Sequence, residues 1–174
     1  MSLLTRLDLD QLSPAGLWSQ LDDATREEAV RSVYNDGPGG GKLEADLAIA
    51  NALRFRPDAV KQLPLERRVR YLLKTVHIDD SLASTILVAL HLGERAEILQ
   101  TFLDELGIPQ TGGLIDEGYD LQPPDAEALT RAAALICARF DASQADLYLA
   151  ALVALDPVTW GGLRDVIAAR QRGQ

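Results

Sequence analysis

The chain has 174 residues, of which 47% are apolar and 25% are charged, so it can bury a core and has the composition of a folded protein, not a disordered one. Its net charge of −9 argues against a general affinity for nucleic acid. The single cysteine, Cys137, excludes an intramolecular disulfide framework, and no export signal or membrane-spanning apolar run is visible, so we expect a cytoplasmic protein.

Capping and turn residues divide the first quarter of the chain. Residues 3–12 alternate leucine with polar residues, which predicts an extended arm or a frayed first turn. Ser13 followed by proline is typical of a helix start, and the aspartates at 22–23 cap a second helix that runs to Tyr34. The glycine- and proline-rich segment 35–41 must end that helix, because these residues do not continue one.

Helical periodicity then continues through three further segments. Apolar residues from Lys42 to Leu53 recur at helical spacing, and Pro57 either ends this helix or opens a short helical turn. Pro64 opens a helix to Val76, whose apolar positions face one way. We therefore expect a helix, a short turn and a second helix in this part of the chain.

The segment from Ser81 to Gly93 carries no formal charge and is apolar nearly all round, with Ser84 and His91 on one polar stripe. A helix of this kind must be buried by neighbours on several sides. Asp79 or Asp80 would cap it. We predict that this helix, near residues 80–93, is the centre around which the other helices pack.

A long segment without helical period follows the next helix, which carries its apolar stripe over residues 98–106. Structureless loops of this length are uncommon in compact domains. This segment, residues 110–123, contains four apolar residues, so we expect an arm laid across helices. We place the weakest seam of a single domain (1–174) at residues 107–124. The apolar residues are Leu114, Ile115, Tyr119 and Leu121.

Three helices are expected in the remaining chain, over residues 125–140 and 141–155 and from Pro157 onward. Many core positions of the first two are alanine, which would let these helices approach closely. No strand pattern is visible anywhere. The sequence predicts an all-α fold, an irregular array of about ten short antiparallel helices arranged as a bundle or as a HEAT-like stack.

The glycines that precede Gly41-Lys42 resemble part of a phosphate-binding loop. That loop needs a glycine where this chain has Asp36, a hydroxyl where it has Leu43, and a strand before it. All three requirements fail. We expect an interhelical turn and no nucleotide.

Residue types that ligate metals occur at His77, Asp79, Asp80 and His91. His91 lies nearly one helix length beyond the aspartates, so the set does not converge as a metal site requires. We expect capping aspartates, a buried and hydrogen-bonded His91, an inert Cys137, and neither a metal nor another cofactor.

Basic residues concentrate in one segment. Between Arg54 and Lys74 the local charge is +5, whereas the rest of the chain carries −14. Two interpretations stay open, a solvated helix face that balances nearby acidic helices and a surface that recognises anions. The candidate anion- or partner-binding residues are Arg54, Arg56, Arg67, Arg70 and Lys74.

The sequence carries no catalytic motif, so we expect a non-catalytic protein–protein interaction or scaffold module. Its partner would be a protein, acidic if the basic segment binds it. A homo-oligomer is compatible with this expectation, whereas nucleic acid and membrane partners are disfavoured. The first alternative is a regulatory domain that binds a small ligand or anion through residues 54–74. The second is an enzyme whose polar residues converge only in three dimensions, and a deep pocket that holds His77 or His91 with a carboxylate would favour it.

Overall fold

Side-chain caps begin the helices at the positions that the sequence predicts. Ser13, Asp22, Asp79, Asp125 and Asp141 each accept a hydrogen bond from a backbone N–H in the first helical turn. The structure is a computed structural model that describes residues 7–35 and 39–172. Within this part of the chain the α-helices are α1 (Pro14–Gln20), α2 (Asp23–Ser32), α3 (Lys42–Leu53), α4 (Pro57–Lys61), α5 (Leu65–Lys74), α6 (Asp80–Leu92), α7 (Ala96–Glu105), α8 (Ala126–Arg139), α9 (Ala142–Leu155), α10 (Pro157–Trp160) and α11 (Leu163–Arg172).

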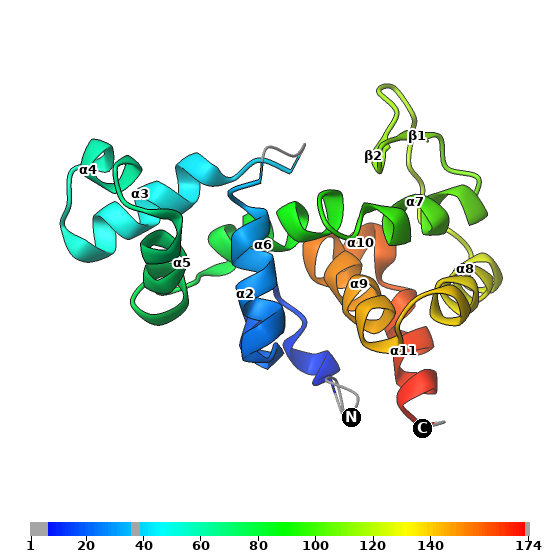
Figure 1. Ribbon diagram of the computed structural model, residues 1–174. Helices are drawn as coiled ribbons and strands as arrows, with labels where there is room; N and C mark the ends of the chain where they lie inside the picture. Colours follow the sequence, from blue (N-terminus) through cyan, green and yellow to red (C-terminus); the bar gives the residue numbers. More distant parts are fainter. Residues whose placement is uncertain (1–6, 36–38, 173–174) are drawn as a thin grey trace.

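The central position of α6 is confirmed. Helices α1, α2, α3, α7 and α9 all contact it, and α3–α5 lie on one side of α6 while α7–α11 lie on the other (Figure 1). Ile86, Leu87 and Leu90 are fully buried. Because α6 touches both groups of helices, its apolar surface is shared between them, which is why the sequence shows it apolar nearly all round.

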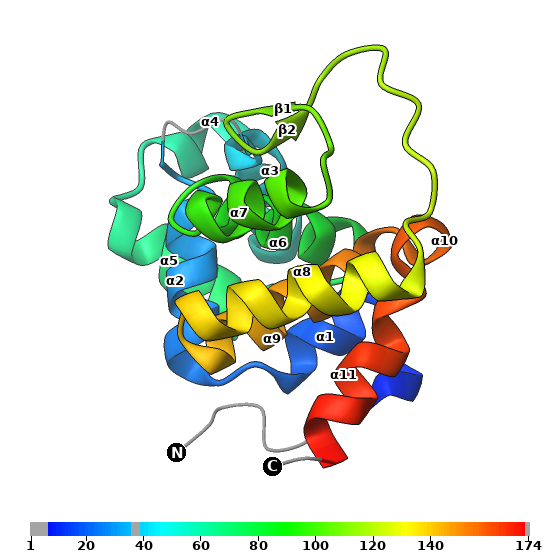
Figure 2. The same cartoon turned by 90° about the vertical axis from the view of Figure 1, so that its right-hand side faces the viewer.

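The alanine-rich helices α8 and α9 pack against each other and against α11, and Figure 2 shows α8 lying across α9. Ala132, Ala133, Ala145 and Ala150 are fully buried. Small side chains let helix backbones approach closely, so these alanines build the compact C-terminal part that the sequence predicts.

A small hairpin lies where the sequence shows no strand. Strand β1 (Gln110–Thr111) pairs antiparallel with β2 (Leu114–Ile115), and the turn between them contains two glycines with positive φ, Gly112 at 62° and Gly113 at 90°. A Cβ at Gly113 would lie 2.7 Å from Leu99 Cδ2 of α7. The expectation of no strand is wrong here, because strands of two residues are too short to show an alternating pattern.

The predicted arm across the helices is only partly formed by this segment. Ile115 and Leu121 are half-buried against the core, whereas Leu114 and Tyr119 are exposed. The chain between the hairpin and α8 runs out from the helices before it returns (Figure 2). Of the four apolar positions that the sequence singled out, only Ile115 and Leu121 are therefore packed against the helices.

The last helix is also different from expectation, because it is divided into α10 and α11 at Gly161–Gly162. A Cβ at Gly161 would lie 2.6 Å from the Pro157 carbonyl oxygen, and one at Gly162 would lie 2.9 Å from Leu129 Cδ1 of α8. The close approach of α8 therefore requires a glycine at 162, and the local turn toward the Pro157 carbonyl requires one at 161.

At the N-terminus, the predicted arm is described only from Leu7, where a 3₁₀ turn (Leu9–Gln11) lies between buried Leu7 and Leu12. Residues 3–6 of that arm and residues 36–38 of the glycine-rich turn lie outside the described part of the chain. Within residues 7–35 and 39–172, no helix combines the length and the apolar character needed to cross a membrane.

Candidate functional site

The basic residues singled out in the sequence lie at the α3–α5 end of the molecule. Arg67, Arg70 and Lys74 are exposed on α5, while Val69 and Leu72 of the same helix are buried. Arg54 follows α3 with a left-handed φ of 55°, and Arg56 precedes α4; both are exposed. We call the surface formed by these five exposed cations the basic end.

None of these five cations forms an ion pair with another described residue. Lys42, Arg164 and Arg172 also form no ion pair with a described residue. Arg164 instead donates a hydrogen bond to the Leu9 carbonyl at 2.8 Å. The other eight of the sixteen described cations are held in ion pairs, and seven of these eight are arginines. The paired cations are Arg26, Arg31, Lys61, Arg68, Arg95, Arg131, Arg139 and Arg170.

Arg68 shows why the exposed cations of α5 point outward. Its guanidinium lies 3.3 Å from the buried Asp46 carboxylate of α3 and 4.7 Å from the centre of the Tyr34 ring. The Tyr34 hydroxyl donates to the same carboxylate at 3.1 Å. Burial, and next the charge of Asp46, raise the pKa of Tyr34, so the hydroxyl keeps its proton. This cluster fixes α5 on α3 and sets which face of α5 meets solvent.

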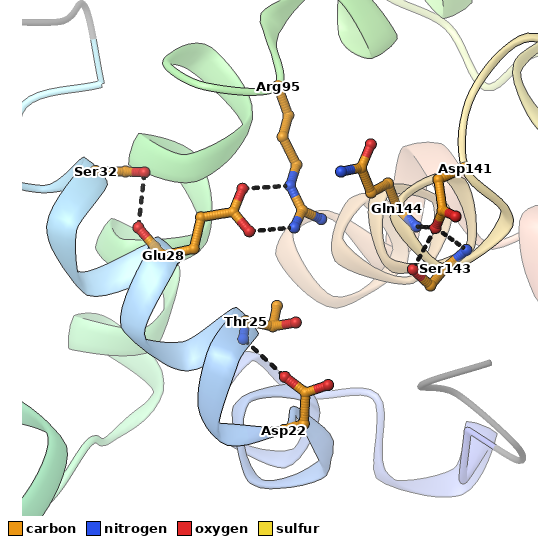
Figure 3. A network of polar contacts seen from close by, with 8 residues as sticks. All are labelled: Asp22, Thr25, Glu28, Ser32, Arg95, Asp141, Ser143 and Gln144. Atoms are coloured by element: carbon orange, nitrogen blue, oxygen red, sulfur yellow. Dashed lines mark hydrogen bonds and ion pairs between the residues drawn. The ribbon is translucent and has the colours of Figure 1, made fainter. Parts of the chain in front are cut away.

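A second polar cluster lies between α2 and the start of α9, around a cleft of about 220 Å³ (Figure 3). Arg95, just before α7, donates from Nε and Nη2 to the two carboxylate oxygens of Glu28, at 3.0 and 2.7 Å. Arg95 is buried, whereas the Glu28 side chain is 38% exposed. Thr25 and Gln144 line the same cleft. The paired charges balance each other, and the pair ties α2 to the start of α7.

The only buried histidine of the described chain, His91, lies beside a different pocket, of about 300 Å³. Its Nδ1 lies 2.8 Å from the Leu87 carbonyl oxygen, which can only accept, so Nδ1 carries the proton. Burial lowers the pKa of His91 to about 4. The neutral ring therefore presents Nε2 as an acceptor, and neither Nε2 nor the nearby hydroxyl of Tyr148 has a hydrogen-bond partner among the described residues.

This pocket does not have the composition that would favour an enzyme. Its lining comes from α6, α7, the hairpin and α9, and it contains no carboxylate among the described residues. The residues around it are mainly aliphatic, including Val88, Leu92, Leu99 and Leu152. The other histidine, His77, is exposed at a surface pocket of about 530 Å³ whose lining also contains Glu44 and Asp79.

The residues with metal-ligand side chains are dispersed. Asp79 accepts from Leu82 N–H at 2.9 Å and caps α6, and Asp80 accepts from Ala15 N–H at 2.8 Å and ties α6 to α1. His91 is buried at the other end of the helix. Within the described residues, no group of three or more His, Cys, Asp or Glu side chains is placed to hold a metal ion.

Cys137 is half-buried in α8, where burial raises the pKa of its thiol and the charge of Arg170 only partly offsets this effect. The sequence showed no basic neighbour because Arg170 comes from α11. A thiol with a raised pKa is a poor nucleophile at neutral pH.

Sequence reasoning missed Arg95, Glu28 and Tyr148. Arg95 is the one cation between two strongly apolar segments, but only the structure shows that it is buried and therefore needs a partner. The partner, Glu28, is 67 residues away and resembles any other exposed acid of an amphipathic helix. No local sequence pattern singles out Tyr148, because its hydroxyl is of interest only next to His91, which lies far away in the sequence.

Comparison of the chain with protein-family models, with curated proteins and with solved structures finds no match in any of the three.

Proposed function

We propose that this protein is a non-catalytic, cytoplasmic protein-interaction module that binds an acidic segment of a partner protein at its basic end. The observation that supports the proposal is the absence of ion pairs at Arg54, Arg56, Arg67, Arg70 and Lys74 within the described chain, although the chain has 26 acidic residues. The hydrogen bond and charge of Arg31, and to a smaller extent the charge of Arg70, lower the pKa of Glu66, but none of the five basic-end cations is within ion-pair distance of a described carboxylate. Arginine is also suited to a carboxylate-rich partner, because its guanidinium can bind a carboxylate through two parallel hydrogen bonds.

The single cysteine, which rules out an intramolecular disulfide framework, supports the cytoplasmic part of this proposal. The negative charge of the rest of the chain favours an acidic protein segment over nucleic acid, because it would repel a long polyanion. Because the rest of the chain is acidic, a second copy of this protein could also supply the acidic segment.

A charge-reversal experiment tests the proposal. The double variant Arg67→Glu/Arg70→Glu changes the net charge by −4 at the basic end. Its matched control, Arg131→Glu/Arg139→Glu, makes the same change on α8, where both side chains are more than half exposed (57% and 56%). Because Arg131 and Arg139 are ion paired with Glu105 and Glu97, a thermal melt first shows that the control is folded, and a difference in binding between the two folded variants then reports the position of the reversed charges.

The first readout is the anisotropy of a fluorescent decaglutamate peptide at low and moderate salt. We expect wild type and control to bind it with similar, salt-sensitive affinity, and the basic-end variant to bind at least about tenfold more weakly with little salt dependence. Equal binding by all three proteins would contradict the proposal. Displacement of the peptide by inorganic phosphate at submillimolar concentration would favour the alternative, a regulatory domain that binds small anions.

The second readout is capture of proteins from a lysate with the same three proteins. We expect the basic-end variant to lose a set of captured proteins that the control retains. Retention of the whole set at both salts would remove the basic end from consideration. Sedimentation of the wild type alone shows whether a second copy supplies the acidic segment.

A further inference from the structure

The volume of the pocket beside His91 limits the size of a ligand, and its aliphatic lining favours an apolar one. Its volume is about 300 Å³, and its wall is made by side chains of α6, α7 and α9 together with the hairpin, with no charged side chain among the described residues. An apolar cavity of about 150 Å³ accommodates benzene, so this pocket has room for roughly twelve non-hydrogen atoms. Leu114 of β2 lies at the pocket and is 49% exposed, so the pocket is reached from the hairpin side.

Two polar groups at this pocket define the rest of the ligand. His91 Nε2 is an acceptor without a donor, because Nδ1 holds the only ring proton on the Leu87 carbonyl. The Tyr148 hydroxyl can donate and accept, and it also lacks a partner among the described residues. The two rings are neighbours, with centroids 5.4 Å apart, yet the hydroxyl and Nε2 are not hydrogen bonded to each other.

Unpartnered groups of this kind are rare in native interiors, and each one calls for an explanation. Among the described residues, three buried side-chain polar atoms lack a hydrogen-bond partner. Two of the three, His91 Nε2 and the Tyr148 hydroxyl, belong to residues of this one pocket, and the third is Nε of Arg68. An alcohol or phenol O–H supplies what both lack, a donor for Nε2 and an acceptor for the Tyr148 hydroxyl. A charged head group placed against these two atoms would be left without a counter-ion and is excluded by its desolvation cost.

We propose that this pocket binds a small uncharged molecule with an apolar body and one hydroxyl group, which His91 Nε2 and the Tyr148 hydroxyl recognise. This site is distinct from the basic end and does not depend on the function proposed there. Both polar atoms are covered by the pocket wall, so the hydroxyl reaches them after neighbouring side chains rotate, as commonly happens on binding.

Three matched probes test the chemistry by isothermal titration calorimetry at pH 7. They are 4-ethylphenol, 4-ethyltoluene, which carries a methyl group in place of the hydroxyl, and 4-ethylbenzoate, which carries a charge. We expect 4-ethylphenol to bind with a submillimolar Kd, 4-ethyltoluene to bind roughly five- to tenfold more weakly, and 4-ethylbenzoate not to bind, because only the first satisfies the buried groups without bringing a charge.

Two variants locate the binding. Tyr148→Phe keeps the ring and removes the hydroxyl, so its affinity for 4-ethylphenol should approach that for 4-ethyltoluene. Leu152→Trp fills the pocket and should abolish binding of both neutral probes, whereas Leu135→Trp, at an exposed position of α8, should leave it within about twofold of wild type.

The comparison of probes on the wild type decides the matter even if a variant fails to fold. Equal affinity for 4-ethylphenol and 4-ethyltoluene, or no binding of 4-ethylphenol at millimolar concentration, would overturn the proposal. Unchanged binding of 4-ethylphenol to a folded Leu152→Trp protein would overturn it as well, because the probe would then be bound elsewhere.

Discussion

Two buried polar side chains four residues apart, His91 and Arg95, are accommodated in opposite ways. Arg95 keeps its charge and has a carboxylate partner in Glu28, whereas His91 gives up its charge and is bonded on one side only. The sequence predicts a buried, hydrogen-bonded His91, and this is confirmed for Nδ1 but not for Nε2. The difference arises because Nδ1 is bonded to the Leu87 carbonyl of the same helix, whereas a partner for Nε2 would have to come from another element, and the neighbouring Tyr148 of α9 does not provide one.

The neutral state of His91 predicts how stability varies with pH. Burial lowers the pKa of His91 from its ordinary 6.5 to about 4, so between these values the unfolded chain binds a proton that the folded protein does not. The free energy of unfolding should therefore fall as pH drops from about 6.5 to about 4, by about 3 kcal/mol from this residue. Urea denaturation at several pH values measures this change.

The control for this prediction is the other histidine. His91→Leu should lose most of the slope between pH 4 and 6.5, while His77→Ala, at an exposed position, should retain it. A wild-type slope in His91→Leu would show that carboxylates, not this ring, cause the pH dependence.

The Glu28–Arg95 pair should respond unequally to removal of its two members. Glu28→Ala leaves a charge on a guanidinium whose side chain is only 6% exposed, and we expect it to cost about 3 kcal/mol. Arg95→Met leaves Glu28, which is 38% exposed and can be hydrated, so we expect a cost of about 1 kcal/mol. Denaturant unfolding of both variants checks this order, and a larger loss in Arg95→Met would contradict the account.

At the scale of elements, helix boundaries follow from side chains that lie within the helix itself or next to it. The aspartate caps of α6, α8 and α9 satisfy backbone N–H groups three residues away or fewer, so the sequence contains all the necessary information. The division between α10 and α11 and the hairpin were missed because both depend on glycines that approach other elements.

The burial of α6 predicts the effect of a charge at its centre. Leu87 is 0% exposed, so Leu87→Asp places an unpaired carboxylate in an apolar site and should cost several kcal/mol of a total stability of roughly 5–15. We expect loss of the cooperative thermal transition in circular dichroism. Ser81→Asp, at an exposed position of the same helix near its N-terminus, is the control and should melt close to wild type. A folded Leu87→Asp protein with an unchanged melting temperature would refute the central role of α6.

At the scale of the molecule, one connected set of buried residues extends from Leu12 and Leu17 through α6 to Leu163 and Ile167. The two groups of helices in Figure 1 therefore share apolar surface through α6. This continuity argues that the weak seam at residues 107–124 does not separate two folding units.

We therefore predict that the protein unfolds in one transition, with a calorimetric enthalpy equal to the van't Hoff enthalpy. Limited proteolysis should cut first at residues 116–120, which are mostly exposed, and the two fragments should stay associated. Two separate transitions, or a fragment on either side of the seam that folds alone, would contradict the prediction of a single domain.

The sequence by itself determined the all-α class, the central helix and the ends of most helices, because these depend on periodicity and caps that act within a few residues. It also located the basic end, since Arg67, Arg70 and Lys74 share a face through helical spacing alone. Only the tertiary structure decided that Arg68 turns inward to Asp46 while its neighbours have no ion pair in the described chain. It alone brought His91 beside Tyr148 and Glu28 beside Arg95, because such pairs join residues more than fifty positions apart, and no local pattern encodes that separation.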